Sequence, residues 1–145
     1  MKIESLFSVA GKTAVVTGGS RGIGEMIARA LVENGANVII TSRKAHDCEG
    51  LAAQLGPAYT AIPADLSQMA EIERFAAAVA ARTPKLDILF NNAGASWGAG
   101  FDEFPESGWD KVMDINVKSV FFLTQKLSPL LEAAAGPGHL AKVIN

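Results

Sequence analysis

The feature that most constrains this chain is a glycine-rich stretch that runs from Thr17 to Gly24. It follows the apolar run 13–16 and precedes apolar residues at helical spacing, which predicts a strand, a tight turn and a helix N-terminus. Glycines let the backbone approach a pyrophosphate, and a helix start offers free N–H groups and a partial positive charge. We therefore expect a dinucleotide cradle here rather than an ordinary glycine-rich cap. Its expected cofactor-binding residues are Gly18, Ser20, Arg21, Gly22, Ile23 and Gly24.

Short apolar runs alternate with helix-period segments along the whole chain. The runs expected to form buried strands cover residues 13–17, 38–41, 59–63, 86–90 and 141–145. The longest helix is expected from about residue 109 to residue 135, with a kink or rearranged last turns at Pro129. This alternation predicts one domain of the α/β class over residues 1–145. We expect a Rossmann-like, doubly wound parallel sheet with helices on both faces, in three α/β/α layers.

Composition and charge argue against several other classes of protein. The 145 residues are 49% hydrophobic and 19% charged, which indicates a globular domain. The net charge is −2 without a basic cluster, so nucleic acid is not an expected partner. No apolar run approaches the about 18 residues of a membrane span, and no signal peptide is recognised, so we expect a cytoplasmic protein. Cys48 is the single cysteine, and no metal site is expected; His46 and His139 are expected to be solvated.

The residues after the second expected strand bear on which dinucleotide is bound. Dinucleotide-binding folds place an acidic residue about 20 residues beyond the glycines, where it binds the ribose 2′-hydroxyl. This chain has Ser42, Arg43 and Lys44 there and no carboxylate. An arginine fork and a serine hydroxyl suit a 2′-phosphate, which Arg21 can also reach. The pattern favours NADP(H) over NAD(H); the alternative is a solvated basic pair.

Polar residues also follow the third and fourth expected strands. Asp65 can accept the adenine amino group with Leu66 packed on the ring, or it can stabilise a helix that Ser67 caps. The sequence Asn-Asn-Ala-Gly at 91–94 can tie neighbouring strands together through its amides. Its last three residues, expected beside the cofactor ribose, are Asn92, Ala93 and Gly94.

Two further features leave alternatives open. Asn116 is a polar residue on an apolar helix, so it either serves an active site or is a hydrogen-bonded structural amide. A group of aromatic residues either lines a substrate entrance or packs within its own loop. These residues are Trp97, Phe101, Phe104 and Trp109.

Taken together, the motifs resemble those of the short-chain dehydrogenase/reductase family. The glycine stretch resembles the cofactor loop of this family, Asp65-Leu66 its adenine site and residues 91–94 its fourth-strand motif. The segment 92–99 resembles the NADP(H)-dependent 3-oxoacyl reductases linked to rhamnolipid synthesis. The resemblance implies that Asn116 is the catalytic asparagine, which takes part in a proton relay. It further implies a small carbonyl or alcohol substrate and a homotetramer or homodimer for the full-length protein.

The resemblance also implies residues that this sequence does not contain. The family uses a Ser beyond the fifth strand and a Tyr-x-x-x-Lys pair, whereas Tyr59 is the only tyrosine here and Pro63 stands four residues after it. We therefore expect the sequence to be the N-terminal part of a single-domain reductase, ending in or just after the fifth strand. The polypeptide alone is expected to be inactive. The alternative is a module that binds or senses a dinucleotide without catalysis.

Overall fold

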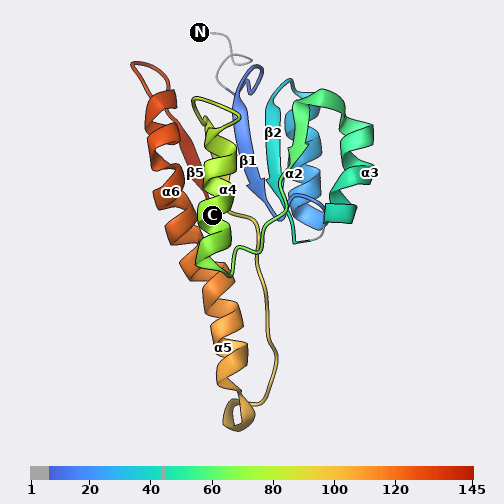
Figure 1. The fold of residues 1–145 in the computed structure, drawn as a ribbon, viewed down its shortest axis with the longest axis vertical. Helices are drawn as coiled ribbons and strands as arrows, with labels where there is room; N and C mark the ends of the chain where they lie inside the picture. Colours follow the sequence, from blue (N-terminus) through green and yellow to red (C-terminus); the bar gives the residue numbers. More distant parts are fainter. Residues whose placement is uncertain (1–6, 44) are drawn as a thin grey trace.

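The computed structural model confirms the expected α/β class. It describes residues 7–43 and 45–145, and the side chains of residues 45–49 lie outside this description, so the expectations for His46 and Cys48 are not tested. In the described chain, five parallel strands form one sheet in the order β3-β2-β1-β4-β5 (Figure 1). The strands are β1 (Thr13–Thr17), β2 (Asn37–Thr41), β3 (Tyr59–Ala61), β4 (Ile88–Phe90) and β5 (Lys142–Ile144).

Helices cover both faces of this sheet. The helix α2 (Gly22–Glu33) lies beside β1 and β2 and α3 (Ala45–Leu55) lies beside β3, whereas α4 (Met69–Ala80) and α6 (Ser119–Ala134) pack side by side on the other face (Figure 1). The chain passes from β1 through β2 to β3, then returns to β4 beside β1. The strand order therefore reverses between β1 and β4, and such a switch point is where open α/β sheets bind ligands.

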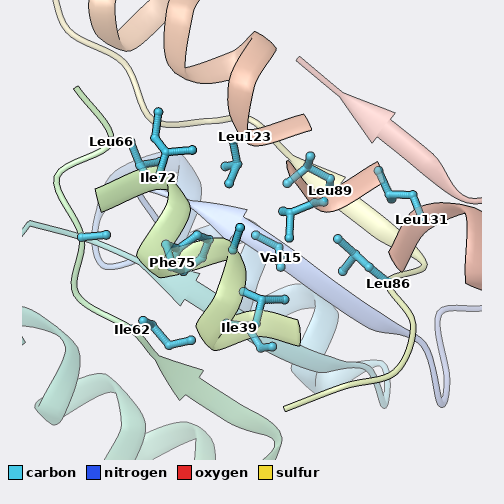
Figure 2. Packing of buried hydrophobic residues seen from close by; sticks show 14 residues of the cluster. Val15, Ile39, Ile62, Leu66, Ile72, Phe75, Leu86, Leu89, Leu123 and Leu131 are labelled. Carbon is cyan, nitrogen blue, oxygen red and sulfur yellow. The ribbon is translucent and has the colours of Figure 1, made fainter. Parts of the chain in front are cut away.

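Two apolar cores lie on the two faces because side chains alternate along each strand. Val15, Ile39 and Leu89 pack with α4 and α6, and Phe75 is fully buried among them (Figure 2). Val16 and Ile40 belong to the second core, with α2 and α3. Both cores hold the sheet rigidly, so the loops at its carboxyl edge have a fixed support.

The long helix at the end of the chain differs from the expected one. It begins with α5 (Glu106–Met113), which projects from the domain in Figure 1, and a π-helical turn at Asp114–Lys118 joins α5 to α6. α6 continues past Pro129 to Ala134. Proline lacks the N–H that would bond to the Gln125 carbonyl, and the Ser128 hydroxyl donates to that carbonyl instead, at 2.9 Å. A local side-chain bond thus replaces the missing backbone bond.

The expectation that His139 is solvated holds only in part, because its side chain is 38% exposed but pairs with a buried carboxylate. A turn at residues 136–139 brings Nε2 of His139 to 2.8 Å from Oδ1 of Asp87, whose side chain is only 3% exposed. Oδ2 of the same carboxylate accepts the Thr13 N–H at 2.9 Å. Burial raises the pKa of Asp87, but the bonds from Thr13 and His139 and the nearby Lys85 charge outweigh it and lower the pKa overall. The carboxylate therefore ties β1, β4 and the turn before β5 together.

This lowered pKa predicts acid sensitivity. A carboxylate with a lowered folded-state pKa stabilises the protein above its unfolded-state pKa, near 3.8, and this stabilisation is lost as the pH falls through the folded-state value. We expect urea unfolding at neutral pH to show Asp87→Asn less stable by about 1–3 kcal/mol. The difference between variant and wild type should shrink as the pH is lowered below 3.8. A difference that is constant across this range would contradict the assignment.

Candidate cofactor-binding site

The carboxyl edge of the sheet holds a cavity of about 420 Å³. It is bounded by the glycine stretch after β1, the end of β2, the loop after β3, the loop after β4 and one side of the α5 region. Every cofactor-binding residue expected from the sequence lines it. These residues are Gly18, Ser20, Arg21, Gly22, Ile23, Gly24, Ser42, Arg43, Asp65, Leu66, Asn92, Ala93 and Gly94. Their part in binding a cofactor stays a prediction.

The glycine stretch forms a compact turn in which some of the glycine positions leave no room for a Cβ atom. Gly18 has φ of +66° and its N–H donates to the Thr41 carbonyl at 2.8 Å, which ties the turn to β2. A Cβ on Gly24 would overlap the Gly18 carbonyl and lie 2.5 Å from Nδ2 of Asn92. Arg21 occupies the N-cap of α2 and forms no capping side-chain bond. The first N–H groups of α2 are therefore available to an anion in the cavity.

The end of β2 adds a polar wall to the cavity. The Ser20 hydroxyl donates to the Ser42 hydroxyl at 2.8 Å, so the glycine turn and the end of β2 are joined. Arg21 and Arg43 both line the cavity, and among the described residues neither guanidinium forms an ion pair. Two guanidinium groups that form no ion pair with the described residues, together with two hydroxyls, form a suitable site for a phosphate.

Asp65 partly has the structural role that was one of its two expected roles, because it bonds to Ser67 before α4. Its Oδ1 accepts the Ser67 N–H at 3.1 Å and the Ser67 hydroxyl at 2.8 Å. The expectation that Ser67 caps α4 was wrong: the N-cap is Gln68, without a side-chain bond. Since Ser67 fixes the Asp65 carboxylate in the cavity wall, both roles that the sequence left open are compatible with this geometry.

The end of β4 is tied to both of its neighbours, as the two asparagines predicted. Nδ2 of Asn91 donates to Oδ1 of Asn145, the residue after β5, at 2.8 Å. Nδ2 of Asn92 donates to the Thr17 carbonyl at 2.9 Å. The buried Thr17 hydroxyl accepts the Ala93 N–H at 2.8 Å and donates to the Phe90 carbonyl at 3.3 Å. These bonds fix the two strand ends that flank the switch point.

We expect Thr17→Val to destabilise the domain by about 1–3 kcal/mol, because the isosteric valine removes the bonds of the buried hydroxyl to two partly buried backbone groups, the Ala93 N–H and the Phe90 carbonyl. The measurement is the free energy of urea unfolding. Thr60→Val, at a partly buried position of β3 whose hydroxyl forms no hydrogen bond with the described residues, is the matched control and should change stability by less than about 1 kcal/mol. Equal effects of the two substitutions would show that the Thr17 bonds are unimportant.

Asn116 lies in the π-helical turn, outside the cavity lining. Its Oδ1 accepts the Ala95 N–H at 3.0 Å and its Nδ2 donates to the Ala95 carbonyl at 2.7 Å. Both ends of the amide thus hold the loop that follows residues 91–94. The structural alternative is therefore the one the geometry shows, and a catalytic role stays a prediction.

Sequence analysis missed several cavity residues. The two from the α5 region, Lys111 and Ile115, lie one helical turn apart, so their spacing was the only available signal. The aromatic residues of the loop after β4 were expected either to line a substrate entrance or to pack within their own loop. The Trp97 ring lies against Gly108, which agrees in part with packing. Phe101, by contrast, is 96% exposed.

Searches of the described residues for two other features were negative. Side chains of His, Cys, Asp and Glu form no group of three or more that could hold a metal ion. None of the described helices combines the length and apolar character required to cross a membrane.

The family of the chain follows from comparison with known proteins. Residues 12–145 match the family described as short chain dehydrogenase. The chain belongs to the short-chain dehydrogenase family. Over 142 residues it is 53% identical to the rhamnolipids biosynthesis 3-oxoacyl-[acyl-carrier-protein] reductase of Pseudomonas aeruginosa, covering 96% of the chain and 55% of that protein. It is 35% identical to the NAD-dependent glycerol dehydrogenase of Listeria innocua, covering 96% of the chain and 53% of that protein.

Solved structures of short-chain dehydrogenases have the same fold. The NADP active-site complex of RhlG from Pseudomonas aeruginosa superposes with a TM-score of 0.90 at 52% identity, covering 96% of the chain and 55% of RhlG. The 3-ketoacyl-(acyl-carrier-protein) reductase of Brucella melitensis, complexed with NADH, has a TM-score of 0.86 at 31% identity, covering 94% of the chain and 57% of that protein. This short-chain dehydrogenase therefore spans about half the length of the relatives it matches.

Proposed function

We propose that this chain is the cofactor-binding part of an NADP(H)-dependent reductase that converts a carbonyl, such as a 3-oxoacyl group, to a hydroxyl. The observation that carries the cofactor assignment is that Arg21 and Arg43 line the cavity with Ser42 and form no ion pair with the described residues. The solved structures of relatives contain both cofactors. The structure of RhlG is a complex with NADP, and that of the Brucella reductase is a complex with NADH. The charge at the end of β2 is what favours NADP(H) here.

The cavity residues divide the cofactor between them in this proposal. The free N–H groups at the start of α2 bind the pyrophosphate, while Ser42 and the two arginines bind the 2′-phosphate. Asp65 accepts the adenine amino group, and Leu66 packs against the ring. Gly24 fits this assignment because its missing Cβ leaves the cradle open. When bound, the nicotinamide supplies the hydride.

Asn116 is proposed to serve the proton relay through its backbone. Both ends of its side-chain amide are bonded to Ala95, so the amide is not free to hold a water. The π-helical turn around it alters the regular pattern of helical hydrogen bonds, and such turns often occur at functional sites. The side chain then acts by fixing the loop that follows β4.

We further propose that the 145-residue polypeptide alone does not catalyse carbonyl reduction. Carbonyl reduction needs a proton donor near the carbonyl. The only tyrosine, Tyr59, is 4% exposed within β3 and packs in the second core. We expect the absorbance of NADPH to stay constant when a 3-oxoacyl ester is added. Turnover by this polypeptide would overturn the proposal of inactivity.

A second candidate is a module that binds or senses the dinucleotide without catalysis. Cofactor binding is expected of both candidates. Assays of a protein of the relatives' length, with the Ser and the Tyr-x-x-x-Lys pair beyond Asn145, would separate them, because only the reductase then consumes NADPH.

Assembly of the whole protein is proposed to bury one side of α6. Phe121 is 62% exposed and Val117 is 52% exposed on this side. Together with Val143 of β5 they line an apolar groove, and a surface of this kind indicates a protein contact. We propose a homodimer or homotetramer for the full-length protein. Light scattering that shows a monomer would overturn this.

A further inference from the structure

Lys111 adds a third cation to the lining of the cavity. It lies on α5 and lines the cavity beside Ile115 and Ala95. Its Nζ lies 5.1 Å from the centre of the Trp97 ring, within the range of a cation–π interaction. The ammonium is thus carried on an aromatic surface at the edge of the cavity.

No carboxylate neutralises this ammonium in the part of the chain that the structure describes. Asp114 lies close on the same helix, but its carboxylate pairs with Lys118 at 3.2 Å. The cavity carboxylate, Asp65, accepts its bonds from Ser67. Lys111 forms neither a hydrogen bond nor an ion pair with the described residues. An ammonium offers three donors, so these remain available to a ligand.

The Trp97 ring that carries Lys111 is itself held in place. A Cβ on Gly108 would come within 2.7 Å of the indole, so the ring lies closely against the α5 backbone. Ala95 lies two residues before Trp97, and the Asn116 side chain bonds to both the N–H and the carbonyl of Ala95. The loop is therefore attached to the α5 region at two points. Lys111 is positioned before a ligand arrives, which reduces the entropy lost on binding.

We propose that Lys111 is a further phosphate-binding residue of the cavity, one that donates to a phosphate oxygen of the bound dinucleotide. This inference rests on the proposed function. With Lys111, three cations line the cavity proposed for a ligand that carries a pyrophosphate and, in NADP(H), a 2′-phosphate. Arg21 belongs to the glycine stretch and Arg43 follows β2, whereas Lys111 lies on α5. The phosphate oxygen belongs to the pyrophosphate or to the 2′-phosphate, and a comparison of NADPH with NADH distinguishes them.

The test is titration calorimetry of NADPH and NADH into the wild-type chain, Lys111→Met, Lys111→Arg and the control Lys126→Met. Lys126 lies on α6, pairs with Glu73 and is outside the cavity lining, so its substitution makes the same change in net charge. We expect Lys111→Met to weaken NADPH binding by about five- to tenfold at low salt. The loss should shrink as salt rises. Lys111→Arg should recover most of the affinity, and Lys126→Met should stay within about twofold of wild type.

Each outcome decides a separate point. A loss for both cofactors assigns Lys111 to the pyrophosphate, and a loss for NADPH alone assigns it to the 2′-phosphate. If the wild type binds NADPH and Lys111→Met binds it equally well, the Lys111 inference is wrong while the proposed function stands. The inference also fails if Lys126→Met weakens binding as much as Lys111→Met. If the wild type binds neither cofactor, the proposed function and this inference fail together.

Discussion

Replacing Gly24 with alanine is expected to weaken NADPH binding by about 100-fold or more. The added Cβ would overlap the Gly18 carbonyl and approach the Asn92 amide, and both belong to the fixed edge of the sheet. Because the clash involves backbone atoms, a rotamer change cannot relieve it. The turn must move, and this displaces the N–H groups that receive the pyrophosphate. Titration calorimetry with NADPH measures the effect.

Gly98→Ala is the matched control for this substitution. A Cβ at Gly98 meets no atom within 4 Å, and the residue is not among those that line the cavity. Its affinity should stay within about twofold of wild type. Circular dichroism should show that both variants are folded. If folded Gly24→Ala bound NADPH as well as wild type, the pyrophosphate would not lie where we place it.

Replacing Arg43 with glutamate is expected to reverse the cofactor preference. NADPH loses a charge-assisted contact and meets a like charge, so its affinity should fall by about 100-fold. NADH has no 2′-phosphate, and the new carboxylate can accept a bond from its ribose hydroxyl. Its affinity should therefore be unchanged or improved. The ratio of the two dissociation constants is the quantity to measure.

Arg82→Glu provides the control for charge alone. Arg82 lies beyond the end of α4, donates to the Ala78 carbonyl at 3.0 Å and does not line the cavity. Both substitutions change the net charge equally, but only Arg43→Glu should alter the ratio for the two cofactors. Equal losses of NADPH and NADH affinity in Arg43→Glu would mean that Arg43 lies elsewhere than at the 2′-phosphate.

Patterns that depend on local periodicity could be predicted from the sequence. The strand at Thr13–Thr17 and the helix after Gly22 have strong apolar patterns, and both lie where expected. The cavity lining was also predictable, because parallel strands bring their carboxyl ends to one edge. One motif after each strand was enough to identify most of that lining.

Contacts between distant segments could not be predicted in this way. The His139 ring bonds to the Asp87 carboxylate because the turn at residues 136–139 brings the two residues together. No apolar periodicity indicates this contact. Lys111 enters the cavity because the loop after β4 carries Trp97 onto α5. The π-helical turn at Asn116 similarly depends on tertiary bonds to Ala95. Each feature is set by packing, which a single sequence does not display.

We propose that the cavity at the switch point binds NADP(H). Titration calorimetry of the wild-type chain with NADPH and with NADH, under one salt concentration, tests this most directly. We expect NADPH to bind at least about tenfold more tightly than NADH, since the two ligands differ by the phosphate that Arg21 and Arg43 receive. Equal affinities, or tighter binding of NADH, would contradict the cofactor assignment. Failure to bind either would contradict the site itself.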